Sequence, residues 1–430
     1  MTGPLTLPLG LYRAGMAVLE PATAAVLAAR LRRGKEDRTR LAERRGHPGR
    51  SRPAGRLAWL HGASVGETIS LLPVVERLTR RGFSVLVTSG TVTSAGLLAR
   101  RLPPGAIHQF MPLDVPRYLR RFLDHWAPNL VLVAESEIWP NTIVEVSRRG
   151  IPLIMVNARL SERSFRRWQR LPKTAHALLE RFDLCLAQSQ ADGERIARLG
   201  APRVVVAGNL KFDVPAPPAD PTTVATLNGL VAGRPVWAAT STHPGEEEMV
   251  AAVHRALQAR FPSLLTIIAP RHPERGEQVA AIAAEHGLRG SQRSRGLLPD
   301  RATDIYVADT IGELGLFYRL APVVFVGGSL VPRGGQNPIE PAKLGAALMH
   351  GPYVHNFTDV YAAIDRAEGA LPVNDARALA HGLAALLADA ARVRRMARAA
   401  AATVDGLGGA VERTMRAIEP YILQMHLEAR

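Results

Sequence analysis

Residues 323–351 read VVFVGGSLVPRGGQNPIEPAKLGAALMHG, and this order of residue types predicts a buried strand, a glycine-rich loop and the start of a helix. Residues 323–326 are all apolar, which suits a central strand of a parallel sheet. Gly327 and Gly328 follow directly, and glycine lets backbone N–H groups approach a ligand closely. The turn that these glycines form with Ser329 is therefore a candidate phosphate-binding element.

A second pair of glycines and a predicted helix start complete this stretch. Gly334 and Gly335 indicate another tight turn, and Asn337 and Pro338 suit the N-cap and the first position of a helix. The positive end of such a helix attracts a phosphate group, and Glu340 in its first turn is placed to accept hydrogen bonds from a ribose diol. An ordinary strand–loop–helix connection explains each feature alone. Their crowding into one short stretch favours a nucleotide site.

From residue 57 onward, short apolar runs alternate with helical patterns, which is typical of βαβ units and a parallel sheet. The first series of predicted strands is 57–61, 84–88, 107–110, 130–134, 152–156, 184–188 and 204–207. The second series is 236–239, 264–269, 304–307, 323–326 and 347–350. Two such series predict an α/β protein with two Rossmann-like, doubly wound domains that face a cleft at the carboxyl ends of their strands.

A proline-rich stretch separates the two series of predicted strands and indicates an interdomain linker at 211–223. We therefore expect a first domain over residues 51–210 and a second over residues 224–405. Residues 1–50 and 406–430 remain as an N-terminal segment and a C-terminal segment.

The N-terminal segment, residues 1–50, joins an apolar stretch to a run of basic residues. Prolines, glycines and charged residues interrupt the apolar stretch at 5–29, so it lacks the roughly 18 consecutive apolar residues that indicate a spanning helix. Arginines dominate residues 30–45, and such residues bind lipid phosphates at a membrane surface. We expect a helix that lies on, or dips into, the cytoplasmic leaflet. An amphipathic helix packed on the first domain is the alternative.

Composition indicates a large enzyme with an anionic partner. The 430 residues carry a formal net charge of +16, which favours contact with nucleic acid, phosphorylated lipid or a membrane surface. The single cysteine, Cys185, lies in an apolar run and excludes an internal disulfide and cysteine-rich metal sites. A reducing compartment is the natural inference.

The sequence WLHGASVGE at 59–67 ends a predicted strand, turns on Gly62 and enters a helix. It places Glu67 in the first helical turn, close in sequence to Ser64 and Gly66. A carboxylate in a partly dry cleft can act as a general base that takes a proton from a sugar hydroxyl. The spacing from Ser64 to Glu67 is also that of a capping box, in which Glu67 only complements the helix dipole. Taken by itself, the spacing favours the capping role.

Two further strand ends carry polar side chains. Ser89 and Thr91 lie where a strand meets a helix, and their hydroxyls suit substrate binding or capping. Glu135 and Glu137 follow the strand at 130–134 and suit an acceptor amine or hydroxyl, a metal ion, or neighbouring arginines. The sequence lacks Asp-x-Asp, the usual metal–diphosphate clamp, which argues against a metal.

The remaining candidate residues have cationic or amide side chains. Asn157 and Arg159 suit a phosphorylated acceptor, although a solvated basic face explains this cationic run equally simply. Lys211 lies at the predicted mouth of the cleft. Arg271 follows a strand of the second series, and a guanidinium group binds phosphate or carboxylate in a bidentate way. All of these candidates follow predicted strands at their carboxyl ends, where an α/β sheet binds its ligands.

These ordered motifs resemble one family over nearly the whole chain. They lie at 61–67, 89–94, 112–114, 135–141, 157–159, 208–213, 242–246, 270–275 and 327–340. On these residues the chain resembles the 3-deoxy-D-manno-octulosonic acid (Kdo) transferases, which move Kdo from CMP-Kdo onto lipid A precursors in Gram-negative bacteria.

The resemblance implies an inverting, metal-independent GT-B glycosyltransferase without a cofactor, bound to the cytoplasmic side of the inner membrane. It implies a CMP-Kdo donor, a phosphorylated lipid A precursor as acceptor, and no nucleic-acid partner. Glu67 matches the proposed general base of the family, which reverses the capping interpretation. The C-terminal segment, 406–430, is expected to form a helix that packs back on the first domain.

Candidate site residues divide between donor and acceptor. The donor side comprises Lys211, Arg271, Gly327, Gly328, Ser329, Gly335, Asn337 and Glu340. The acceptor side comprises Ser64, Gly66, Ser89, Thr91, Glu135, Glu137, Asn157 and Arg159.

Two other functions remain open at this stage. One is a different enzyme on the same fold, such as a UDP-sugar transferase or a sugar-nucleotide epimerase. The other is a basic, non-enzymatic nucleic-acid binder, whose affinity falls steeply with salt. The low aromatic content, 5%, and the absence of an RNA-binding aromatic motif count against the second.

Overall fold

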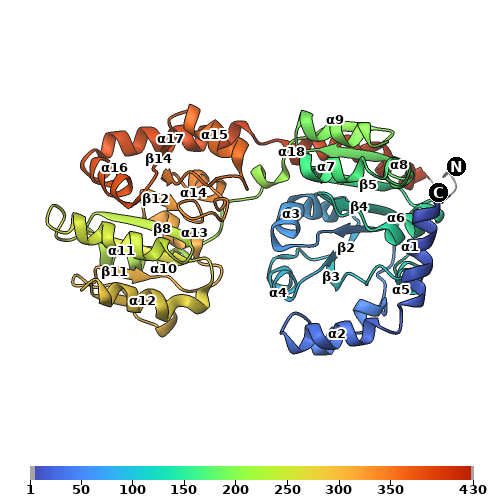
Figure 1. The fold of residues 1–430 in the computed structure, drawn as a ribbon, viewed down its shortest axis with the longest axis horizontal. Coiled ribbons are helices and arrows are strands. Elements are labelled where there is room, and N and C mark those ends of the chain that lie inside the picture. The colour runs from blue at the N-terminus through green and yellow to red at the C-terminus, as the bar shows by residue number, and fades with distance from the viewer. Residues whose placement is uncertain (1–4, 428–430) are drawn as a thin grey trace. The chain divides into compact units, whose positions relative to one another are not determined.

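The structure is a computed structural model and describes residues 5–427. The chain divides into two compact units, Met1–Val214 together with Gly408–Arg430, and Pro215–Leu407. Within each unit, helices cover both faces of a central sheet (Figure 1). Residues 1–4 and 428–430, at the ends of the predicted terminal segments, lie outside the described residues.

The first unit is built on a seven-stranded sheet in the order β3-β2-β1-β4-β5-β6-β7. Every neighbouring pair of strands is parallel. The strands are β1 (Leu57–His61), β2 (Ser84–Ser89), β3 (Ala106–Phe110), β4 (Leu130–Ala134), β5 (Leu153–Ala158), β6 (Leu184–Ala187) and β7 (Val204–Val206). The predicted strands of the first series are confirmed, with ends that differ by one or two residues.

The helices of the first unit connect these strands or flank the sheet. They are α1 (Leu7–Val18), α2 (Thr23–Arg32), α3 (Val65–Arg80), α4 (Val92–Arg101), α5 (Pro116–Trp126), α6 (Pro140–Arg148), α7 (Glu162–Trp168), α8 (Pro172–Leu179), α9 (Gln190–Arg198) and α18 (Ala410–Leu427). Short 3₁₀ turns lie at η1 (Arg38–Arg40), η2 (Glu43–Arg45) and η3 (Leu210–Phe212).

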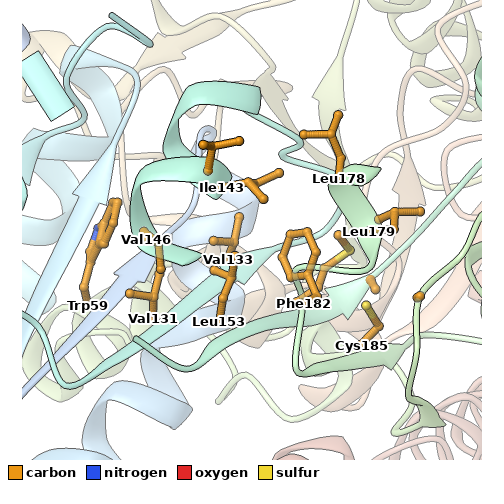
Figure 2. Packing of buried hydrophobic residues seen from close by; sticks show 14 of the residues in the cluster. Trp59, Val131, Val133, Ile143, Val146, Leu153, Leu178, Leu179, Phe182 and Cys185 are labelled. Carbon is orange, nitrogen blue, oxygen red and sulfur yellow. The ribbon is translucent and has the colours of Figure 1, made fainter. Parts of the chain in front are cut away.

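Both faces of the first sheet are buried, so its strands are apolar without interruption. Trp59 of β1 and Val131 of β4 point into the cluster covered by α6 and α8 (Figure 2). Their neighbours Leu60 and Leu132 point to the opposite face and pack with apolar residues of α3 and α18. Successive side chains of a strand point to opposite faces of the sheet. Because both faces are buried here, these strands do not show the alternation of apolar and polar residues that marks a half-exposed strand.

The C-terminal helix α18 belongs to the first unit. Its apolar side chains, among them Met415, Ile418 and Ile422, share a cluster with residues of β1, β2 and α3. Backbone N–H groups of Gly409 and Val411 donate to the Asp213 carboxylate, which fixes the start of the helix. Helix α18 therefore packs on the sheet of the first unit, on the same face as α3.

The second unit repeats the parallel architecture in the order β10-β11-β9-β8-β12-β13-β14. Its strands are β8 (Val236–Thr242), β9 (Leu265–Pro270), β10 (Gly290–Gln292), β11 (Ile305–Val307), β12 (Val323–Val326), β13 (Ala347–His350) and β14 (Ala370–Pro372). Its helices are α10 (Pro221–Val231), α11 (Glu246–Leu257), α12 (Gly276–Glu285), α13 (Leu314–Leu320), α14 (Ile339–Lys343), α15 (Thr358–Arg366), α16 (Ala376–Ala388) and α17 (Ala390–Gly406), with 3₁₀ turns η4 (Pro273–Arg275) and η5 (Arg293–Arg295). The predicted doubly wound α/β class is confirmed.

Two edge strands and the linker differ from the sequence prediction. β10 and β14 are each only three residues long, and β10 has the polar sequence Gly-Ser-Gln, so the sequence prediction missed them. Within the predicted linker 211–223, Phe212 is buried in the first unit, and Pro221 begins α10 of the second. The units divide between Val214 and Pro215.

Helix α1 attaches to the first unit through polar side chains and exposes apolar ones. The Tyr12 hydroxyl donates to Asp114, and Arg13 pairs with Glu145 at 2.6 Å. In contrast, Leu7 and Leu11 are 77% and 64% exposed. Leu9 of the same helix is 1% exposed and packs into the core of the first unit, so α1 has apolar side chains on its outer face as well as on its inner face.

No single described helix is both long and apolar enough to cross a membrane. By length and composition, α1 and α2 pass that test only as a pair, with a bend of 71° between them.

Candidate active site

Each sheet has a switch point, where the strand order reverses and the carboxyl ends of parallel strands leave a crevice for ligands. In the first unit this point lies between β1 and β4. In the second it lies between β8 and β12. The segments that follow these four strands contain Glu67, Glu137, His243 and Gly328. Some of the residues singled out from sequence therefore lie at the switch point of each unit.

Glu67 lies in the first turn of α3, after the turn that follows β1. Its Oε2 accepts from the Ala63 N–H at 2.8 Å, and its Oε1 accepts from the Ser64 hydroxyl at 2.6 Å. The Ser64 hydroxyl oxygen accepts from the Glu67 N–H at 3.3 Å, so Ser64 is the N-cap. The predicted N-cap role of Ser64 is confirmed, but the Glu67 carboxylate accepts from the Ala63 N–H instead of the Ser64 N–H of a capping box. These contacts also orient the carboxylate, whose oxygens each retain a lone pair for a further donor.

Two more acids lie close to Glu67 at the end of β4. Burial, followed by the negative charge of Glu67, raises the pKa of Glu137, and the charge of Glu135 adds to this. The Trp139 indole, which donates to Glu137 at 2.6 Å, opposes the shift. Glu137 therefore holds a proton more readily than an exposed glutamate does.

His61, at the end of β1, is buried against this acidic group. Its Nδ1 lies 3.2 Å from the Thr88 carbonyl, which can only accept, so Nδ1 carries the proton. Its Nε2 lies 4.0 Å from Glu137 and has no hydrogen-bond partner among the described residues. Burial lowers the pKa of His61 to about 4, so the ring is neutral.

Lys211 lies in the first unit, where its Nζ pairs with Glu135 at 2.8 Å. Within its own unit it lies beside Glu135, one of the predicted acceptor residues. Asn157 is 1% exposed, and its side-chain oxygen accepts from the Leu210 N–H at 2.9 Å. The Asn157 side-chain oxygen therefore holds the turn that carries Lys211, while its buried amide nitrogen has no hydrogen-bond partner among the described residues, and its acceptor contact stays a prediction.

Four predicted acceptor residues have structural roles or lie at the surface. Ser89 is buried, with its hydroxyl 2.9 Å from His108 Nε2, and its acceptor contact stays a prediction. Thr91 is the N-cap of α4 and accepts from the Ser94 N–H at 3.1 Å. Gly66 and Arg159 are exposed.

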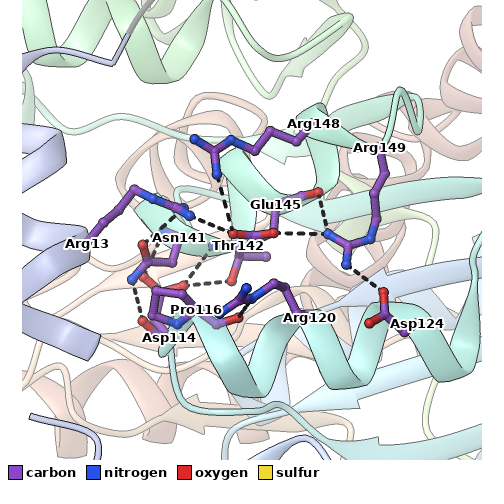
Figure 3. Close-up of polar contacts among 10 residues, drawn as sticks. All are labelled: Arg13, Asp114, Pro116, Arg120, Asp124, Asn141, Thr142, Glu145, Arg148 and Arg149. Atoms are coloured by element: carbon purple, nitrogen blue, oxygen red, sulfur yellow. Dashed lines mark hydrogen bonds and ion pairs between the residues drawn. The ribbon is translucent and has the colours of Figure 1, made fainter. Parts of the chain in front are cut away.

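The loop that carries Glu135 and Glu137 is anchored by Asp114, which belongs to the 112–114 motif but is not among the candidate site residues. Asp114 accepts from the N–H groups of Asn141 and Thr142 at 3.0 and 2.9 Å and from the Thr142 hydroxyl at 2.8 Å (Figure 3). These N–H groups begin α6, whose own N-cap has no side-chain hydrogen bond. Asp114 therefore supplies the cap from a distant segment.

In the second unit a buried carboxylate occupies the predicted phosphate-binding turn. Glu246, at the start of α11, accepts from the N–H groups of Gly328 at 2.7 Å and of Ser329 and Leu330 at 3.0 Å each. The Gly327 N–H donates to Thr240 O at 2.8 Å. The backbone N–H groups of Gly327, Gly328 and Ser329 are therefore already used within the unit, and their phosphate contacts stay a prediction.

Close packing and backbone conformation explain why glycine occupies positions 327 and 328. A Cβ on Gly327 would lie 2.7 Å from Ser241 O, and Gly328 has a φ of +67°. Ser329 is fully buried, and its hydroxyl accepts from the Gly351 N–H at 2.8 Å.

The predicted helix start at Asn337 is one residue early, and the helix is short. α14 covers only Ile339–Lys343, and the Asn337 side chain accepts from the Ile339 N–H at 3.0 Å. Asn337 also donates to Glu340 at 3.3 Å. The N–H of Gly335 donates to Gly328 O at 2.8 Å and is therefore not available to a phosphate.

Cationic side chains surround His243 at the switch point of the second unit. Burial, followed by the charges of Arg333, His272 and Arg271, lowers the pKa of His243. Its Nε2 lies 3.2 Å from the Gln336 amide nitrogen, which can only donate, so this ring nitrogen is the acceptor. Arg271, which was predicted from sequence, is exposed. Arg333 and His272, which were not among the candidate site residues, also act on His243. This group can bind an anion through side chains.

Among residues 5–427, no group of His, Cys, Asp and Glu side chains is arranged to hold a metal ion.

Fold and site together define a class of protein. Solved structures that share the architecture include a glycosyltransferase from Rickettsia africae, with a TM-score of 0.58 and 11% identity, covering 86% of this chain and 99% of that one. A UDP-GlcNAc 2-epimerase from Neisseria meningitidis has a TM-score of 0.57 and 13% identity, covering 86% and 100%. The fold is that of the GT-B glycosyltransferases and related epimerases.

Closer relatives identify the family. The family described as "3-Deoxy-D-manno-octulosonic-acid transferase (kdotransferase)" matches residues 39–214. The 3-deoxy-D-manno-octulosonic acid transferase of Haemophilus influenzae is 35% identical, covering 90% of this chain and 92% of that protein. That of Bordetella pertussis is 36% identical, covering 86% and 88%. The chain belongs to the Kdo transferase family and is a glycosyltransferase, as the resemblance predicted.

Proposed function

We propose that this chain transfers Kdo from CMP-Kdo to a hydroxyl of a phosphorylated lipid A precursor, with inversion at the anomeric carbon. The observation that carries the proposal is the acidic group at the switch point of the first unit. There Glu67 lies close enough to Glu137 to raise its pKa, in a chain that belongs to the Kdo transferase family.

In the proposed reaction Glu67 takes the proton of the acceptor hydroxyl. The acceptor oxygen forms a bond to the anomeric carbon of Kdo while the bond from that carbon to the CMP phosphate breaks, and the configuration inverts in one displacement. The Ala63 N–H and the Ser64 hydroxyl hold the carboxylate in place during this step. Geometry fixed before the reaction lowers the entropic cost of reaching the transition state.

The donor leaves as CMP, a phosphate monoester whose charge must be stabilised. Arg271 and Arg333 supply cationic donors for the phosphate and for the Kdo carboxylate. Glu340 is proposed to hold the ribose.

A nucleotide-protection assay tests the donor. We expect CMP or CDP at about 100 times its Kd to stabilise the binding-competent fold by about 2.7 kcal/mol and to raise the melting temperature by a few degrees. UDP and UDP-sugars are expected to give no such shift. Protection by UDP-sugars without protection by CMP or CDP would favour the rival epimerase or UDP-sugar transferase.

We further propose that α1 and α2 rest on the cytoplasmic side of the inner membrane, where the acceptor resides. The exposed apolar side chains of α1, of the turn after it and of α2 support this placement; they are Leu7, Leu11, Val18, Leu19 and Val26. Exposed Arg32, Arg33, Lys35, Arg38 and Arg45 follow in sequence and suit anionic lipid headgroups. Arg44 does not take part, because it is buried and pairs with Glu36 at 2.9 Å.

Replacing Leu7 and Leu11 together with aspartate is expected to reduce binding to phosphatidylethanolamine–phosphatidylglycerol vesicles at least about tenfold. Burying one leucine in an apolar phase is worth about 1.5–3 kcal/mol, and the aspartates add charge repulsion. Vesicle sedimentation measures the bound fraction. Leu297→Asp, at a residue 49% exposed in the second unit, is the matched control and is expected to bind normally. Equal binding of all three proteins would refute the placement of α1 at the membrane.

A further inference from the structure

The sequence of the second unit places two acids, Glu246 and Glu247, directly after Gly245, and both are fully buried. The carboxylate of Glu246 lies inside the turn that follows β12. Its Oε1 accepts from the Ser329 and Leu330 N–H groups, and its Oε2 accepts from the Gly328 N–H at 2.7 Å and the His243 N–H at 3.0 Å. A negative charge at this position also interacts favourably with the positive N-terminal end of α11.

This arrangement joins the two loops of the cationic group. The His243 N–H and the N–H groups of residues 328–330 share one carboxylate, so the loop after β8 and the loop after β12 are tied to each other. The second loop continues to Arg333 and to Gln336, whose side chain contacts the His243 ring at 3.2 Å. The Gln336 N–H also donates to Gly327 O at 3.0 Å. Displacing the carboxylate would therefore move Arg333 and Gln336 away from His243.

We propose that Glu246 is a positioning residue for the donor. Its carboxylate fills the anion-binding turn at 328–330, and this holds Arg333, Gln336 and His243 in place to bind the anionic groups of the donor through side chains. The inference rests on the proposed function for the identity of the donor. It differs from the expectation from sequence, in which the backbone of the turn itself binds phosphate.

Glutamine at position 246 is the sharpest substitution. It keeps the size of the side chain, but its NH₂ group must face N–H groups that need an acceptor, in a site without water access. Buried donors left without acceptors are costly, so the loop is expected to open. We expect Glu246→Gln to raise the KM for CMP-Kdo and the Kd for CMP at least about tenfold, since charge-assisted contacts to the donor contribute affinity of this order. The kcat at saturating donor is expected to stay within about threefold, because the acidic group of the first unit is untouched.

Glu248→Gln is the matched control. Glu248 lies in the same helical turn, is exposed, and accepts only from the Gly245 N–H at 2.9 Å. Both kinetic constants of this variant are expected to match those of the wild type. A merely structural role for Glu246 would instead reduce the amount of folded protein and leave the KM and the CMP Kd of the folded fraction unchanged. Wild-type values of KM and of the CMP Kd in Glu246→Gln would therefore overturn the proposal.

Hydrogen exchange of the wild-type chain gives a second readout that does not depend on the variant folding. The amides of residues 328–330 are expected to exchange slowly before any ligand is added, and CMP is expected to add little protection. Fast exchange that CMP slows strongly would show that the turn binds phosphate itself, and would overturn the proposal.

The donor assignment and the role of Glu246 can fail separately. If the wild type binds UDP instead of CMP, the proposed donor is wrong, and the comparison of Glu246→Gln with Glu248→Gln is made with UDP. Weaker UDP binding in Glu246→Gln alone supports the positioning role, and equal binding overturns it.

Discussion

Kdo transfer by Glu67→Gln is expected to fall about 10²–10⁴-fold, which is the usual contribution of a general base, while CMP binding stays normal. Glutamine cannot accept the proton of the acceptor hydroxyl, yet its oxygen can still accept one of the two hydrogen bonds that hold the loop after β1. The transfer rate at saturating CMP-Kdo is the measurement, and calorimetric titration with CMP is its companion. The proposal that Glu67 is the base fails if this variant transfers Kdo at a near-normal rate.

Loss of the capping interaction must be separated from loss of the base. Removing a cap costs typically about 1 kcal/mol, which moves the melting temperature by a few degrees at most in a chain of this size. Glu76→Gln is the matched control, since Glu76 lies on the same helix with its side chain 44% exposed and pairs only weakly with Arg80 at 3.4 Å. We expect wild-type transfer from this control, and a melting temperature of Glu67→Gln too close to that of the wild type to explain its inactivity.

Asp114→Ala is expected to destabilise the first unit by about 3–5 kcal/mol. The substitution leaves the Asn141 and Thr142 N–H groups and the Thr142 hydroxyl without an acceptor in a buried place, and each such loss costs about 1–3 kcal/mol. It also releases Tyr12, which attaches α1. Urea unfolding followed by tryptophan fluorescence reports on this unit, because Trp59, Trp126, Trp139 and Trp168 all lie in it.

The control for this stability effect is Asp124→Ala in the same region (Figure 3). Asp124 pairs with Arg149 at 2.6 Å, but its side chain is 67% exposed. Such surface pairs contribute about 0–1 kcal/mol, so its unfolding midpoint is expected to lie near that of the wild type. A midpoint for Asp114→Ala no lower than that of Asp124→Ala would show that the cap from Asp114 does not stabilise α6.

Burial raises the pKa of Asp114, and the hydrogen bonds from Asn141, Thr142 and Tyr12 oppose the shift. Asp114→Asn keeps one of the two acceptor oxygens, whereas Asp114→Ala removes both. Asp114→Asn is therefore expected to lower the urea unfolding midpoint less than Asp114→Ala does.

Strands and strand ends could be predicted from the sequence because their signals are local. Fully buried parallel strands such as β4 and β12 are unbroken apolar runs, and glycine or a polar residue marks where each one ends. The same reasoning placed Glu67 and Ser64 correctly in a capping turn, because their spacing alone specifies it. The short edge strands β10 and β14 give no such signal.

Contacts between distant segments could not be predicted in this way. Gly328 and Glu246 are far apart in sequence, and only the fold shows that the carboxylate takes the donors that a phosphate was expected to use. Asp114 and Asn141 are another such pair. Three consecutive acids after Gly245 were the available signal for Glu246, since a buried carboxylate at the start of a helix needs hydrogen-bond donors.

The mass of the lipid product is the measurement that tests the central claim most directly. Purified full-length chain is incubated with CMP-Kdo and a lipid IVA-like precursor, beside Glu67→Gln and Glu76→Gln. We predict lipid heavier by Kdo with the wild type and Glu76→Gln, and little or none with Glu67→Gln. Lipid of unchanged mass with the wild type, in an assay where another Kdo transferase is active, would contradict the proposed function. Full transfer by Glu67→Gln would contradict the role of Glu67.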